Sequence, residues 1–93
     1  MKPLDPLLNN GLRLGIMSLL IKLESASFVY LKKELHATQG NLSVQLDKLN
    51  QMGYLKIKKG YKEKYPQTLC SITPLGINAF KDHVQNLKNY LHL

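Results

Sequence analysis

The sequence predicts a mainly α-helical domain that carries one small β-hairpin. Apolar residues recur at helical spacing in several segments, one short stretch alternates between apolar residues and lysines, and capping residues mark helix ends. The chain has 93 residues, of which 44% are hydrophobic. This is enough for one core but not for a second domain. We therefore expect residues 1–93 to form a single domain.

The first expected helix covers residues 9–23. Asn9 or Asn10 can cap it. Its apolar residues at helical spacing are Leu12, Ile16, Leu19, Leu20 and Leu23. Other apolar side chains cover most of the remaining circumference, so the helix should be buried on more than one side. We expect one side to face the core and another to face a second copy of the chain. A short extended piece is expected at Phe28, after the polar stretch "ESAS".

Two further helices follow with a tight connection between them. The second is expected over residues 29–36, and the third over residues 38–52. Thr38 is a good N-cap for the third helix, and Gly53 stands where a left-handed C-cap is expected. The inward stripe of the third helix is Leu42, Leu46 and Leu49. The short connection is typical of helix-turn-helix units.

A hairpin is predicted over residues 54–72. Leu55 alternates with Lys56 in the first strand, residues 60–67 form a turn-rich tip, and "TLCSI" forms the second strand. A last helix over residues 74–91 begins with a capping Thr73 and a proline. The full order is helix, short extended piece, helix, tight turn, helix, hairpin and helix. This is the order of a winged helix-turn-helix domain with a three-helix core and a C-terminal dimerisation helix.

The polar face of the third helix is the expected base-reading surface. A recognition helix fits a major groove about 12 Å wide. Gln39 and Asn41 carry amides that can pair with adenine edges, Ser43 can contact a base or a phosphate, and Val44 can touch a thymine methyl group.

The charge of the chain favours an anionic partner. Thirteen Lys and Arg residues against six Asp and Glu residues give a net charge of +7 and a pI near 9.6. Nucleic acid is the first candidate and a membrane surface the second. The expected phosphate contacts are Lys32, Lys33, Lys48, Lys56, Lys58, Lys59, Lys62 and Lys64. Arg13 can add a flanking contact, and Tyr61 and Tyr65 can touch sugar or order the loop.

The last helix carries apolar residues at gaps of three and four, which is a heptad pattern. Its distal half extends beyond what a small core needs, and an exposed apolar patch marks an interface. The expected homodimer interface is Leu12, Ile16, Val84, Leu87, Tyr90 and Leu91. Such a dimer would present two recognition helices to half-sites roughly 34 Å apart.

Other kinds of site find little support in the sequence. We expect no catalytic residues, because no nucleophile–base set, paired carboxylates or Gly-rich phosphate loop is present. The three histidines are scattered and Cys70 is the only cysteine, so we expect no metal, no cofactor and no disulfide. The absence of a signal peptide and of a long apolar run predicts a cytoplasmic protein that does not span a membrane. No site for a small-molecule effector is recognisable.

Two stretches, "GNLSVQLDKLNQMGYLKIKKGY" and "TLCSITPLGINAF", resemble the MarR/ArsR-type winged-helix transcriptional regulators, as does "LRLGIMSLL". The resemblance covers about residues 9–92 and is greatest to the small stand-alone group made of little more than the DNA-binding domain. It implies a sequence-specific, dimeric DNA-binding regulator in a prokaryote. Such helices often carry a basic residue or His after the serine, whereas this chain has Val44, so more of the affinity is expected from the wing.

Two alternatives to a DNA-binding regulator are left open by the residues alone. The first is a winged-helix module that mediates protein assembly without specific DNA readout. The second is RNA binding, which would favour aromatic stacking platforms on an exposed sheet. The short hairpin shows no such platform.

Overall fold

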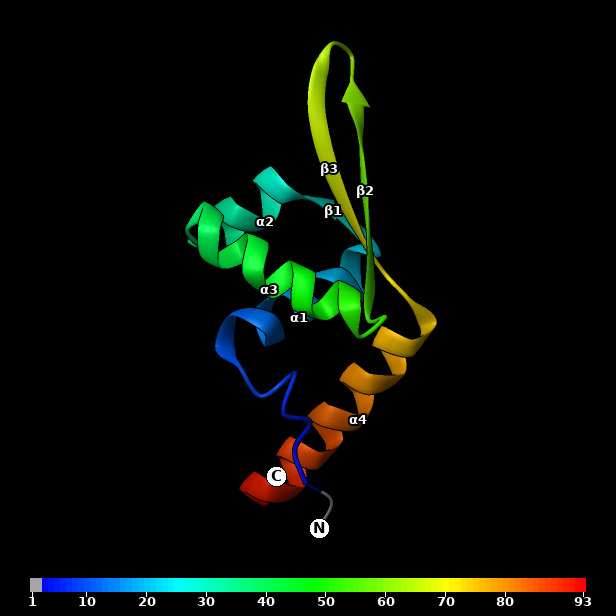
Figure 1. The fold of residues 1–93 in the computed structure, drawn as a ribbon. Coiled ribbons are helices and arrows are strands. Elements are labelled where there is room, and N and C mark those ends of the chain that lie inside the picture. Colours follow the sequence, from blue (N-terminus) through cyan, green and yellow to red (C-terminus); the bar gives the residue numbers. More distant parts are fainter. Residues whose placement is uncertain (1–2) are drawn as a thin grey trace.

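The computed structural model describes residues 3–93 (Figure 1). The elements are α1 (Gly11–Leu23), β1 (Ser25–Ser27), α2 (Phe28–Glu34), α3 (Gln39–Gln51), β2 (Leu55–Lys62), β3 (Tyr65–Ile72) and α4 (Pro74–Leu91). This is the winged-helix arrangement that the sequence predicts, with a three-helix core, a hairpin wing and an additional C-terminal helix. The hairpin projects from one end of the molecule, and α4 extends from the other (Figure 1).

The helices begin at side chains that cap them. A backbone N–H three residues later donates to each cap: Arg13 to Asn10 (3.0 Å), Tyr30 to Ser27 (3.1 Å), Asn41 to Thr38 (3.2 Å) and Gly76 to Thr73 (3.0 Å). After α3, Gly53 adopts a φ of 79°, and the Tyr54 N–H donates to the Leu49 carbonyl. Glycine adopts this left-handed conformation without a steric cost, which explains the sharp end of the helix.

The sheet has three antiparallel strands in the order β1-β3-β2, with Ala26 opposite Cys70 and Ile57 on the other side of Cys70. The expected position of the short extended piece was wrong by a few residues. It is formed by Ser25–Ser27, and Phe28 is already the first residue of α2. This polar stretch is extended because it pairs with β3. The Ser25 and Ser71 hydroxyls, which lie 2.7 Å apart, add a side-chain hydrogen bond to the pairing.

The wing strands are longer than the sequence suggests. The expected turn-rich tip over residues 60–67 is mostly paired strand, because Tyr61 lies opposite Pro66 and Lys62 opposite Tyr65. Only residues 63 and 64 form the turn. Pro66 is tolerated because β1 pairs with residues 69–71 only, which leaves this part of β3 at the edge of the sheet.

The core lies between the three helices and the base of the hairpin. Its fully buried side chains come from every one of these elements and from the segment before α1: Leu8, Ile16, Met17, Leu20, Leu31, Leu42, Leu49 and Cys70, with Leu46 and Leu55 almost as buried. Ile16 was expected at a dimer interface, and this expectation was wrong. Its side chain has no exposed surface and belongs to the hydrophobic core, so it is not available to a second copy of the chain.

Helix α4 has few buried residues for its length. Only Gly76 and His83 are buried on it, while Val84 and Leu87 are half-buried, and Leu91 is exposed. Within residues 3–93 neither ring nitrogen of His83 has a hydrogen-bond partner. No helix of this part of the chain is long and apolar enough to cross a membrane.

Candidate nucleic-acid interface

One side of α3 is turned toward the wing. Gln39, Ser43 and Asp47 recur every four residues and line a cavity of about 280 Å³ together with Lys59 of β2. Gln39 also lines a second cavity of about 550 Å³ between α2 and the hairpin. The two cavities share Phe28, Gln39 and Thr68, and we call them together the wing groove.

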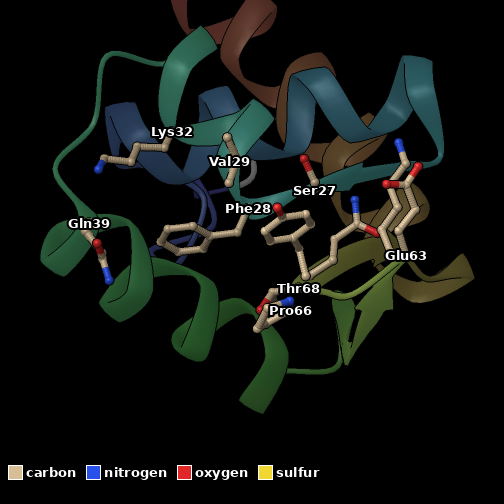
Figure 2. A pocket seen from close by; sticks show the side chains of 11 residues that line it. Ser27, Phe28, Val29, Lys32, Gln39, Glu63, Pro66 and Thr68 are labelled. Atoms are coloured by element: carbon tan, nitrogen blue, oxygen red, sulfur yellow. The ribbon is translucent and has the colours of Figure 1, made fainter.

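Apolar and polar side chains both line the wing groove. Figure 2 shows Phe28 between Gln39 and Lys32 on one side and Pro66 and Thr68 on the other. The remaining residues that line the larger cavity are Ser27, Val29, Lys62, Glu63, Tyr65 and Gln67. The groove therefore brings together side chains from α2, α3 and both wing strands.

Three of the eight lysines expected to contact phosphate line this groove. Lys32 comes from α2, and Lys59 and Lys62 come from β2. Their charges lie beside the exposed amide of Gln39, so hydrogen-bonding and cationic groups converge on one surface.

The other five lysines are exposed but do not line the wing groove: Lys33, Lys48, Lys56, Lys58 and Lys64. Strand pairing explains why Lys56 and Lys58 do not line the groove. Lys56 lies opposite Ser71 and Lys58 opposite Leu69, and alternation turns both toward the face of the hairpin that Lys59 does not share. Lys64 is in the two-residue turn at the wing tip. The eight lysines are therefore spread over α2, α3 and both faces of the wing, and only three of them share the groove with α3.

The expected base-reading residues divide between two sides of α3. Gln39 and Ser43 line the wing groove, whereas Val44 lies on the outermost face with half of its surface exposed (50%). Asn41 does not line the wing groove, and its side chain is exposed. Its side-chain Oδ1 accepts a hydrogen bond from Gln45 Nε2 at 2.9 Å.

This last contact is part of a network that the sequence did not indicate. Arg13 of α1 donates from Nη1 to Gln45 Oε1 and from Nε to the Leu7 carbonyl. Gln45 is buried although it is polar. Arg13, which was expected to add a flanking phosphate contact, is half-buried, and its Nε and Nη1 already donate within the protein. The only sequence signal for Gln45 was its position one turn after Asn41 on the same helix.

The wing tip is exposed and contains an unusual backbone conformation. Tyr61 and Tyr65 are 79% and 73% exposed, so neither packs into the protein. Glu63 adopts a φ of 60° at the first turn position, a region that L-residues other than Asn and Asp seldom occupy. The turn therefore uses a residue that does not suit its conformation.

Two protonation equilibria are altered near the base of the wing. Burial, and then the hydrogen bond that the Tyr54 hydroxyl donates to Asp5 Oδ2 at 2.8 Å, raise the pKa of Tyr54 to about 12. Burial raises the pKa of Cys70 to about 11, so its thiol is protonated at neutral pH. Both groups are neutral structural residues. Within residues 3–93 no group of three or more His, Cys, Asp or Glu side chains could hold a metal ion.

Comparison with known proteins now identifies the architecture. Residues 12–91 match the family described as winged helix DNA-binding domain. The chain belongs to this family. The uncharacterized protein MJ0432 of Methanocaldococcus jannaschii is 37% identical over 79 residues, which are 85% of this chain and 86% of that protein.

Solved structures with a similar fold agree with this assignment. The transcriptional regulator homologue protein from Pyrococcus horikoshii OT3 is 32% identical, with a TM-score of 0.87 over 92% of this chain and 85% of that chain. The transcriptional regulator BldR from Sulfolobus solfataricus is 25% identical, with a TM-score of 0.74 over 86% of this chain and 56% of that chain. The resemblance to winged-helix transcriptional regulators is thereby confirmed.

Proposed function

We propose that this winged-helix protein binds specific sites on double-stranded DNA as a homodimer and regulates transcription by occupying them. In this proposal α3 enters the major groove and the wing lies along the flanking backbone. Gln39, Asn41, Ser43 and Val44 contact base edges or adjoining phosphate, and the exposed lysines neutralise phosphates.

One observation carries the proposal. The amide of Gln39, on the first turn of α3, opens into the same groove as Lys32 of α2 and Lys59 and Lys62 of the wing. A hydrogen-bonding helix face needs phosphate contacts on both sides to hold its register on DNA. Here Lys32 of α2, the helix before α3, and Lys59 and Lys62 of β2, the strand after it, are available for those contacts.

The proposal is tested by selecting bound fragments from random double-stranded DNA and measuring their affinity at two salt concentrations. We expect an enriched motif, and a log–log salt slope of about −0.9 for each phosphate neutralised. A variant with Lys58, Lys59, Lys62 and Lys64 all changed to Glu should lose DNA binding while it keeps its fold. If that variant binds DNA as well as the wild-type protein, the wing is not part of the interface. An enriched motif is also required, because salt-dependent binding without sequence preference would contradict specific regulation.

The homodimer is supported by the exposed apolar end of α4. Tyr90 and Leu91 are each 56% exposed at the end of α4, a helix that leaves the body of the domain (Figure 1), and Leu93, just after the helix, is 85% exposed. Apolar side chains concentrated at one end of a helix favour contact with another copy, and Leu12, Val84 and Leu87 are half-buried nearby candidates for the same contact.

Sedimentation velocity at micromolar concentration tests the dimer. We expect the wild-type protein to sediment as a dimer and Leu91→Glu as a monomer, because a carboxylate would be desolvated at the interface. Val29→Glu is a matched control, since Val29 is 74% exposed on α2, far along the chain from α4. A wild-type monomer would contradict the proposal, and so would a control variant that dissociates as completely as Leu91→Glu.

A further inference from the structure

We infer that Arg13 and Gln45 set the base preference of the protein, because they turn the Asn41 amide so that it presents hydrogen-bond donors to DNA and therefore selects guanine rather than adenine. This inference rests on the proposed sequence-specific DNA binding. Gln45 is buried, and Arg13 is half-buried with two of its nitrogens donating within the protein. They are positioning residues that act through Asn41.

The direction of the hydrogen bonds follows from the chemistry of Arg13. A guanidinium group only donates hydrogen bonds. The Gln45 atom that faces Arg13 must therefore be Oε1, which accepts from Nη1. The other end of the Gln45 amide is then Nε2, a donor, and the Asn41 atom 2.9 Å from it must be Oδ1. One cation in α1 thus fixes the orientation of two amides in α3.

Burial makes this orientation costly to reverse. Gln45 is 8% exposed, so a flipped amide would place its N–H₂ group against the Arg13 donors with little water to compensate. Arg13 is itself held by a second hydrogen bond, from Nε to the Leu7 carbonyl. The network is therefore anchored at one end in the segment before α1 and ends at the exposed side chain of Asn41 on α3.

The orientation decides which base edge Asn41 can read. An Asn that reads adenine needs both its oxygen and its nitrogen at the base edge, to accept from N6 and donate to N7. In this protein Oδ1 is turned back toward Gln45, while the Asn41 side chain is exposed on the remaining side. What remains for DNA is Nδ2 with its two N–H groups. A donor-only group suits the guanine edge, where N7 and O6 are both acceptors.

Gln39 provides an internal contrast. Its amide opens into the wing groove rather than toward Arg13, so both its oxygen and its nitrogen can approach a base. The two amides of the α3 first turn therefore differ in specificity, although they have the same chemistry in the sequence. Gln39 is suited to adenine and Asn41 to guanine.

Changing Gln45 to Glu tests the inference by reversing the network. The new carboxylate still accepts from Arg13, but it can only accept from Asn41, so the Asn41 amide must turn and present Oδ1 outward. The selected base should then change from guanine to one with an exposed amino group, cytosine or adenine. Gln51→Glu is the matched control, because it adds the same charge to an exposed position of α3 outside the network.

The readout is selection from random DNA for the wild-type protein, Asn41→Ala, Gln45→Glu and Gln51→Glu, with thermal melts to confirm that each is folded. We expect one position where the wild-type protein prefers guanine by roughly tenfold or more. Asn41→Ala should lose that preference, Gln45→Glu should change it, and Gln51→Glu should keep it. Gln45→Met, which keeps the side-chain volume and removes the amide, should relax it if Gln45→Glu fails to fold.

The outcomes separate this inference from the proposed function. If the wild-type protein enriches a motif but its Asn41-dependent position is adenine, the inference is wrong and the proposed function stands. The same conclusion follows if Asn41→Ala changes no position, or if a folded Gln45→Glu leaves the guanine in place. If the wild-type protein enriches no motif at all, both are wrong.

Discussion

Gly76 of α4 lies so close to the backbone carbonyl of Tyr54 that no Cβ fits between them. Two hydrogen bonds hold the same junction, because the Thr73 N–H donates to the Tyr54 carbonyl at 3.1 Å and the Thr73 hydroxyl donates to the Gly53 carbonyl. The first turn of α4 is therefore fixed against the turn that ends α3. The direction in which α4 leaves the domain depends on this contact.

Gly76→Ala should destabilise the protein by about 3 kcal/mol, since the added methyl group would meet rigid backbone and could be accommodated only by moving α4. Urea unfolding followed by circular dichroism measures the change. Gly11→Ala is the control, because nothing lies within 4 Å of a Cβ at that position, and we expect a change below about 1 kcal/mol. Equal stability of Gly76→Ala and the wild-type protein would contradict the described contact.

Glu63→Gly should stabilise the protein by about 1 kcal/mol, because glycine adopts the φ of 60° at the wing turn without the penalty that a Cβ brings. The mutation also removes a negative charge near the lysines, so Glu63→Gln serves as a control for charge alone. Thermal unfolding should show a gain for the glycine variant and almost none for the glutamine variant. A similar gain in both would show that charge and not backbone conformation limits the turn.

Lys59→Ala should weaken DNA binding and reduce the magnitude of its log–log salt slope by about 0.9, which corresponds to one lost phosphate contact. Lys59 is chosen because it lines the wing groove opposite Ser43. Lys88→Ala, in the last turn of α4, provides the comparison and should leave the slope unchanged. Fluorescence anisotropy titrations over a range of salt concentrations distinguish the two variants. An unchanged slope for Lys59→Ala would place the DNA backbone outside the groove.

The contribution of Tyr54 to stability should disappear at high pH. Its pKa is raised from 10.0 to about 12 by burial and then by Asp5, so the folded state favours the protonated hydroxyl. The stabilisation is therefore complete below pH 10 and is lost as the pH rises toward 12. At pH 8, Tyr54→Phe should cost about 1 kcal/mol for the hydrogen bond to Asp5.

Urea unfolding at pH 8 and pH 11 tests this prediction. The difference in the free energy of unfolding between the wild-type protein and Tyr54→Phe should be smaller at pH 11. Tyr61→Phe is the control, because Tyr61 is 79% exposed and should give a difference near zero at both pH values. A difference for Tyr54→Phe that does not decline would mean that the hydroxyl is not preferentially protonated in the folded state.

The helices and their ends could be predicted because their signals are local. Thr38 and Thr73 cap the helices that they were expected to cap, and Gly53 adopts the left-handed conformation after α3. Each of these depends on backbone groups within a few residues of the side chain. The extent of the strands at the wing tip was harder to predict. Gly60 and Pro66 favour a turn, but cross-strand pairing, including that of Tyr61 with Pro66, keeps both residues in strands.

The candidate site was less predictable, because its geometry depends on distant parts of the chain. Sequence spacing located the exposed side of α3 but could not show that Gln39 lines the wing groove while Asn41 is joined through Gln45 to Arg13 of α1. Arg13 was expected at the surface, but it donates a hydrogen bond to Gln45, which lies 32 positions away in the sequence. A contact of that kind has no periodic signal. Ile16 shows the same limit, since helical spacing alone did not distinguish the core side of α1 from its outer side.

The short strand β1 has a mechanical consequence for the whole protein. It ties the link between α1 and α2 to residues 69–71 of β3, so the root of the hairpin is held on both sides. From Tyr65 to Thr68 the hairpin is paired on one side only. The base of the wing is therefore braced by strands on both sides of β3 and its outer half by one strand only, so we expect the outer half to bend more easily than the base.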